Sequence, residues 1–139
     1  MATLQGFIDE VITEVASVSG IRQAPNDPPE KISAWPIAVV YSTAGVAKNA
    51  PAQTLTTLDD VTIAVLVPLV DMARKVALLL PFRESVPLAI NSKLMSTGYT
   101  NAQTFGDITH TFGPVDWAGM ECFGWLFTIK GVKIQTVIT

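Results

Sequence analysis

The chain contains few of the residues that build metal sites and crosslinks. Among its 139 residues there is one cysteine, Cys122, and one histidine, His110. A lone cysteine excludes a disulfide within the chain. The two residues together exclude a four-cysteine zinc site and any site that needs two imidazoles. We therefore expect no metal site.

Charge is also scarce. Charged residues make up 15% of the chain, where about 25% is usual. Nine lysines and arginines against twelve acidic residues give a formal net charge of −3, which does not favour a general electrostatic affinity for nucleic acid. The hydrophobic share of 49% excludes a mostly disordered chain. So little charge on a domain of this size indicates that partners cover part of its surface.

The chain also lacks a long hydrophobic segment. Its longest apolar stretch, residues 61–70, contains Thr62 and Pro68 and is far shorter than the roughly 20 residues of a membrane-spanning helix. The N-terminal segment carries acidic residues and no basic residue before Arg22, unlike a signal peptide. We expect no contact with a membrane, and a protein that is made and used in a cytoplasm.

Motifs for catalysis and cofactor binding are missing as well. There is no glycine-rich phosphate-binding loop, no G-x-S-x-G and no H-E-x-x-H. Asp59 and Asp60 are adjacent, so in a strand their side chains point to opposite faces and cannot share a proton or a metal ion. His110 alternates with Ile108 and Phe112, which favours a partly buried strand histidine over a general base. We predict no catalytic residue, no cofactor and no enzymatic activity.

The first half of the chain predicts a helix and two strands. Apolar residues recur every three or four positions from Leu4 to Val15, with Thr3 as N-cap and Gly20 at the end. After a proline-rich loop, residues 37–41 predict a short strand, and the alternation of residues 58–67 predicts a second one. The small and polar residues 42–56 between them predict a projecting loop.

The middle of the chain predicts a broken helix. One helical piece is expected from Asp71, as its cap, to about Leu80, where Pro81 interrupts it. A second piece is expected from about residue 83 to residue 95, with Ser85 as cap so that Pro87 falls in its first turn.

The last third of the chain predicts strands again, at residues 105–115 and from Cys122 onward. Its apolar residues change parity, from Phe123, Trp125, Phe127 and Ile129 to Val132, Ile134 and Ile138. A one-residue bulge at Lys130 and Gly131 would produce this change. The segment is also too long for one strand of a domain this size, so we expect its end to bend sharply or to pair outside its own fold.

The order of these elements predicts a single α+β domain over residues 1–139. Its sheet is mostly antiparallel, with the N-terminal helix and the broken central helix packed on it.

Contact with other proteins is the function that remains. Clustered aromatic residues are typical of interfaces, and the extended C-terminal segment, residues 132–139, suits addition of a strand to a neighbour's sheet. An edge strand of its own sheet is the equal alternative for that segment. The candidate interface residues are Val46, Lys48, Trp117, Trp125, Val132, Ile134, Val137 and Ile138.

The layout resembles a known family. An amphipathic helix leads through a proline-rich loop into Trp-Pro-Ile-Ala-Val-Val-Tyr at residues 35–41. A projecting loop then leads into Asp-Val-Thr-Ile-Ala-Val at residues 60–65. After that come a helical middle and a long closing strand that ends in Val-Lys-Ile-Gln at residues 132–135. Nearly the whole chain thereby resembles the tail terminator (tail completion or neck) proteins of tailed bacteriophages, through element order and hydrophobic pattern.

The resemblance implies a ring, typically a hexamer, that caps the finished tail tube and docks on the head-tail connector. It implies no enzymatic activity, DNA only as passing cargo in the channel, and a place in the virion after assembly in the host cytoplasm. Residues 42–56 would be a contact arm and residues 132–139 an inter-subunit strand. Two alternatives stay open. One is a head-closure protein of the same neck region, and the other is a ligand-binding or enzymatic domain centred on His110.

Overall fold

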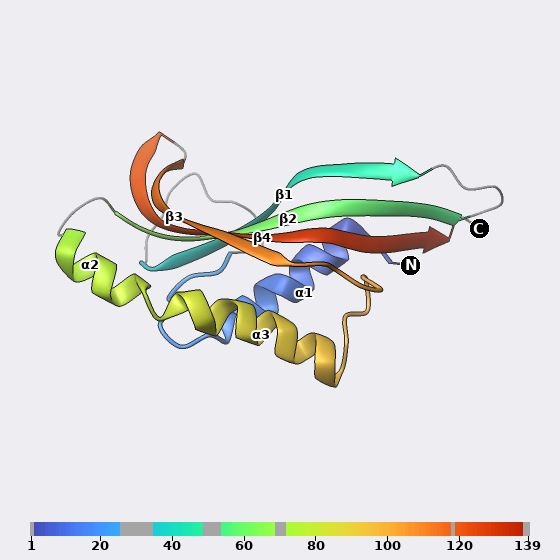
Figure 1. The fold of residues 1–139 in the computed structure, drawn as a ribbon, viewed down its shortest axis with the longest axis horizontal. Coiled ribbons are helices and arrows are strands. Elements are labelled where there is room, and N and C mark those ends of the chain that lie inside the picture. The colour runs from blue at the N-terminus through green and yellow to red at the C-terminus, as the bar shows by residue number, and fades with distance from the viewer. Residues whose placement is uncertain (1, 26–34, 49–53, 69–71, 118, 138–139) are drawn as a thin grey trace.

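A computed structural model describes residues 2–25, 35–48, 54–68, 72–117 and 119–137. Four strands form one antiparallel sheet in the order β1-β2-β4-β3, with the helices along one face (Figure 1). This architecture confirms the α+β prediction. None of the helices in these ranges is long and apolar enough to cross a membrane. In chain order the elements are α1 (Leu4–Ala16), β1 (Ile37–Lys48), β2 (Thr54–Pro68), α2 (Met72–Leu79), α3 (Phe82–Ser96), β3 (Ile108–Trp117) and β4 (Met120–Val137).

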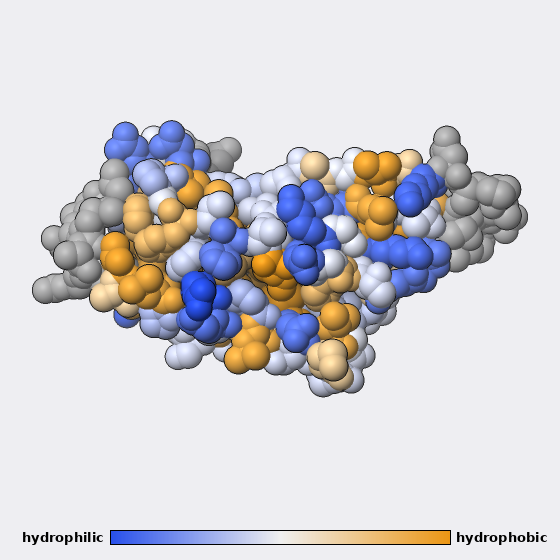
Figure 2. All heavy atoms as spheres, in the orientation of Figure 1, coloured by the Kyte–Doolittle hydropathy of each residue, from blue (hydrophilic) through white to orange (hydrophobic). Residues whose placement is uncertain are grey.

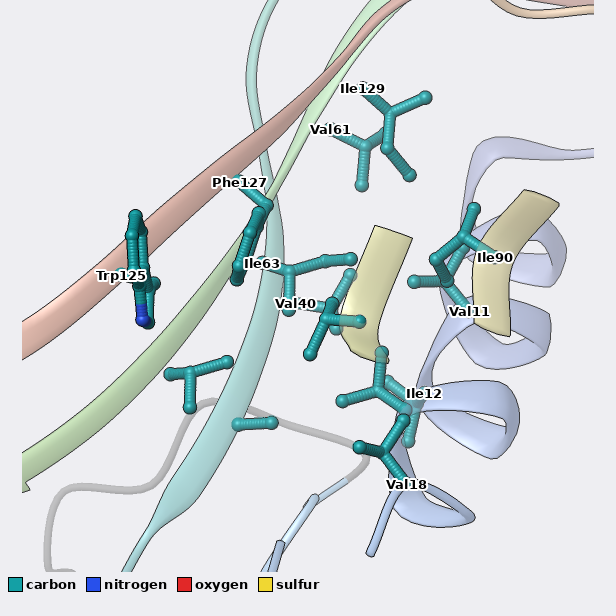
Figure 3. Close-up of a cluster of buried hydrophobic side chains, with 14 of the residues drawn as sticks. Val11, Ile12, Val18, Val40, Val61, Ile63, Ile90, Trp125, Phe127 and Ile129 are labelled. Carbon is teal, nitrogen blue, oxygen red and sulfur yellow. The ribbon is translucent and has the colours of Figure 1, made fainter. Parts of the chain in front are cut away.

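The main core lies between the sheet and the helices α1 and α3. Helix α1 begins as predicted, because the Thr3 hydroxyl oxygen accepts a hydrogen bond from the Gly6 amide at 3.0 Å. Its apolar face and that of α3 meet side chains that point inward from the sheet (Figure 3). Buried members of this core include Phe7, Val11, Val15, Val86, Ile90, Val61, Ile63, Phe127 and Ile129.

A smaller cluster lies on the opposite face of the sheet, and it buries Ile37, Val39, Ala64, Leu66 and Cys122. The β3–β4 hairpin curls toward this face at one end of the molecule (Figure 1). Burial, followed by the nearby Asp116 carboxylate, raises the pKa of the Cys122 thiol above its usual range, which disfavours a reactive thiolate.

The region between the first two strands differs from the prediction. Residues 42–48 belong to β1 and residues 54–56 to β2, so the predicted loop is strand on both sides. Residues 49–53 lie outside the described residues. Small and polar residues carry no strand periodicity of their own, yet Ala44 to Lys48 pair one by one with β2. Cross-strand pairing therefore decides the conformation here.

The second half of the broken helix starts earlier than predicted. Helix α3 begins at Phe82 with Pro81 in the cap position, so Ser85 is not the cap and Pro87 lies inside the helix. Burial of Phe82 in the main core holds the additional turn in place. Pro87 interrupts the backbone hydrogen bonds of the helix at one position only. Asp71, the predicted cap of α2, lies outside the described residues.

Strand β4 stays within its own sheet. It pairs with β2 along its length, from Cys122 to Val137, so residues 132–137 follow the alternative in which this segment is a strand of its own sheet. The predicted bulge is confirmed, because two residues of β4, Lys130 and Gly131, face the single Asp60 of β2. Gly131 has a φ of 61°, which glycine adopts at little steric cost.

A carboxylate joins α1 to the segment between α3 and β3. The Glu10 carboxylate accepts hydrogen bonds from the backbone amides of Thr100 at 2.8 Å and Asn101 at 2.9 Å, and from the Asn101 side-chain amide at 2.7 Å. Burial alone raises the pKa of Glu10. The amide hydrogen bonds and the Lys93 ammonium outweigh it, so the pKa lies below its ordinary value. The ionised form of Glu10 therefore stabilises the fold.

Replacing Glu10 by glutamine is expected to lower the free energy of unfolding at pH 7 by about 1–2 kcal/mol. A glutamine keeps one acceptor oxygen, but its NH2 group is a donor and would face amide groups that need an acceptor. Because the native pKa of Glu10 is lowered, its contribution is complete above the unfolded-state pKa and is lost as the pH falls through the native pKa. Urea unfolding of both proteins between pH 7 and pH 3 measures this, and a difference that does not shrink in acid contradicts it.

Candidate assembly surface

The sheet extends past the helices on one side as an exposed arm, which we define as residues 42–48 of β1 and 54–59 of β2 (Figure 1). All seven residues of β1 in this arm are exposed, whereas the preceding residues 37–40 are buried. Strand β4 runs beside the arm through its residues 132–137. The arm therefore continues the sheet, and the helices cover it far less than they cover the rest of the sheet.

Asp60 stands where the arm leaves the body of the sheet. The bulge in β1 at Thr43 and the bulge in β4 at Gly131 lie on its two sides. Its backbone oxygen accepts hydrogen bonds from the Ser42 and Thr43 hydroxyls at 3.3 and 3.4 Å. Its carboxylate accepts one from the Gly131 amide at 3.2 Å and lies 3.5 Å from the Lys130 ammonium. These contacts fix the direction of the arm, because bulges bend and twist a sheet.

The outer edge of β1 is open along the arm. Near the start of β1, the Ala38 amide donates to the Gln23 carbonyl at 2.8 Å and so covers that end of the edge. Beyond Ala38, no strand of the described ranges pairs with this edge. An edge with unpaired amide and carbonyl groups is a template for a strand of another chain.

The arm carries an apolar row with basic neighbours on one face. Val46, Leu58 and Lys133 are cross-strand partners, so their side chains share that face. Lys48 lies two residues beyond Val46 and therefore on the same face. Val46 is 62% exposed, and Figure 2 shows hydrophobic and hydrophilic side chains next to one another over this part of the molecule.

Of the predicted interface residues, Val46 and Lys48 are exposed on the arm. Trp117 is half-buried, with its ring centroid 5.4 Å from that of Tyr41. Val137 ends β4, but its side chain lies outside the described residues, as does the whole of Ile138.

Three predicted interface residues are buried in their own chain, which corrects the prediction. Trp125, Val132 and Ile134 are only 4%, 0% and 2% exposed. The Trp125 ring nitrogen donates to the Leu79 carbonyl at 2.9 Å. The reason is their register, because all three side chains point from β4 toward the helices and belong to the main core.

His110 lies at an exposed position of the edge strand β3. Its ring is 5.4 Å from that of Trp125, edge to face, and 6.3 Å from that of Phe127. Within the described part of the chain, the imidazole forms no hydrogen bond or ion pair with a carboxylate, and no cluster of histidine, cysteine and acidic residues is arranged to hold a metal ion. The arrangement is a packed aromatic row rather than an acid–base pair.

Sequence reasoning missed Leu58, Lys133 and Asp60. Their place on, beside or at the base of the arm depends on the register between β1, β2 and β4, which requires that β1 continue to Lys48. Of the two bulges beside Asp60, the sequence indicated only the one in β4, through the change of parity in its apolar residues. The described surface thus offers an exposed arm and an open sheet edge for contact with protein. No protein-family model matches this chain, and no curated protein matches it either.

Proposed function

We propose that this chain is a structural subunit that assembles with copies of itself into a ring, and that the ring closes a phage tail tube and joins it to the head-tail connector. In this function the protein acts through its surfaces and not through catalysis. DNA passes through the channel of the ring, and the protein resides in the virion. The resemblance to tail terminator proteins supplies the tube and the connector as partners.

The observation that carries this proposal is the exposed arm. Seven consecutive strand residues stand at a sheet edge without a covering strand in the described ranges. A long uncovered edge is a liability for a monomer, because it invites pairing with other chains. The scarcity of charge, 15% of the residues, supports the same conclusion, since the centres of protein interfaces are depleted of charged residues.

The arm predicts where assembly is sensitive to substitution. Replacing Val46 by aspartate is expected to reduce the solution mass to that of the 14.9 kDa chain, because a charge would enter the contact. Leu88→Asp is the matched control, since Leu88 on α3 is 65% exposed and Val46 is 62% exposed. Light scattering over a dilution series measures both variants and the parent protein. A parent protein that stays monomeric, alone and with tail tubes, contradicts the proposal.

The place of the ring is tested on the tubes themselves. Tube protein from the same phage is polymerised with and without the chain, and the tube ends are examined by electron microscopy. The proposal expects a density at one end of each tube and an end to further growth. Rings that bind only the connector would assign the chain to head closure instead.

A further inference from the structure

Two acidic side chains face each other near the turn of the β3–β4 hairpin. Asp116 and Glu121 are direct cross-strand partners, and both are exposed. Like charges in this position destabilise a sheet. Within the described ranges neither carboxylate forms an ion pair. The pair therefore offers uncompensated negative charge at one end of the sheet.

Two basic side chains lie unpaired on the arm and on the strand beside it. Lys48 on the arm and Lys133 on the neighbouring β4 share one face of the sheet, and neither is in an ion pair with a described residue. Their situation differs from that of Lys130, whose ammonium lies 3.5 Å from the Asp60 carboxylate. The apolar Val46 and Leu58 lie on the same face, and Leu58 is the direct cross-strand partner of both Val46 and Lys133. The face of the arm thus combines positive charge with exposed apolar surface, in a chain whose net charge is −3.

The two charged regions lie at opposite ends of the elongated molecule (Figure 1). An arm cannot reach the hairpin of its own chain, so the charges can compensate each other only between two copies. We propose that Lys48 and Lys133 of one copy contact Asp116 and Glu121 of the next copy. Such a contact joins different surfaces of identical subunits, and repetition of it generates a closed ring or an open filament. The inference rests on the self-assembly proposed above and specifies its contact surfaces.

The charges set orientation and partner choice more than affinity. Exposed ion pairs each contribute little, while like charges brought together at an interface are strongly unfavourable. The exposed Val46 side chain supplies apolar area at the same contact. Reversal of one set of charges is therefore a sharper probe than its removal.

Two charge-reversed proteins test the contact. The arm variant carries Lys48→Glu and Lys133→Glu, and the hairpin variant carries Asp116→Lys and Glu121→Lys. Each alone places like charges at every contact and is expected to need a protein concentration higher by about tenfold or more for assembly. A mixture of the two variants places opposite charges at every contact in an alternating ring. The mixture is therefore expected to assemble at nearly the concentration of the parent protein, measured by light scattering.

Several controls make the result decisive. Glu84→Lys reverses an exposed charge on α3 and is expected to leave assembly unchanged. Circular dichroism and thermal unfolding establish that each variant is folded. If the half-buried Lys133 does not tolerate glutamate, Lys48→Glu at the exposed position is used alone as the arm variant.

The outcomes separate this inference from the proposed function. If the parent protein assembles and the reversals do not weaken it, or if the mixture stays as weak as its components, the charge contact is wrong and the self-assembly stands. If the parent protein does not assemble, alone or on tail tubes, the proposed function fails and the contact fails with it.

Discussion

Replacing Gly124 by alanine is expected to lower the free energy of unfolding by about 3 kcal/mol or more. Gly124 lies near the start of β4, opposite Leu66 of β2. An added Cβ would overlap the Val65 carbonyl oxygen and stand 2.9 Å from its carbon and 3.1 Å from the Leu66 Cα. All three atoms belong to the backbone of a central strand, so the chain cannot relieve the overlap by turning a side chain. Strands β2 and β4 would have to separate.

The matched control is Gly113→Ala on the neighbouring strand. Gly113 is the direct cross-strand partner of Gly124, but nothing lies within 4 Å of the position that its Cβ would occupy. Its replacement is expected to change stability by less than about 1 kcal/mol. Urea unfolding of the two variants beside the parent protein measures the contrast. Equal stability of the variants would mean that β2 and β4 do not approach each other as described.

Replacing Trp125 by alanine is expected to cost about 3–5 kcal/mol of stability. The ring is buried, and its centroid lies 4.4 Å from that of Phe112 and 5.6 Å from that of Phe127. Truncation would leave a cavity in the main core and remove the donor to the Leu79 carbonyl. Trp125→Phe keeps most of the apolar area and loses the hydrogen bond, so we expect an intermediate loss.

Trp117→Ala is the comparison for this prediction, because Trp117 is only half-buried and lies in the smaller cluster on the other face. Its loss is expected to cost less than half as much. Chemical unfolding measures stability, and light scattering at a concentration where each variant is folded measures assembly. A Trp125→Ala protein that unfolds like the parent but no longer assembles would restore Trp125 to the interface and remove it from the core.

Stability and assembly are expected to respond to different residues. Gly124 and Trp125 act through the packing of one chain, whereas Val46 and Lys48 are exposed and support little of the fold. The two sets of substitutions therefore separate a failure to fold from a failure to assemble. This separation matters because an unfolded subunit also loses assembly.

Local patterns were enough to predict several elements of this protein. The spacing from Leu4 to Val15 predicted α1, and Thr3 caps it as expected. The parity change after Ile129 predicted the bulge at Lys130 and Gly131. These features follow from the periods of helix and strand, which depend on neighbours within a few residues.

The sequence by itself therefore determined the fold class, α1, the alternating part of β2 and the bulge in β4. Only the tertiary structure decided that residues 42–48 form strand, that Trp125 faces the helices, and that Asp116 stands opposite Glu121. Each of these facts depends on the register of paired strands or on which face of the sheet the helices cover. Register is a property of the assembled sheet, so a pattern read along one segment cannot supply it.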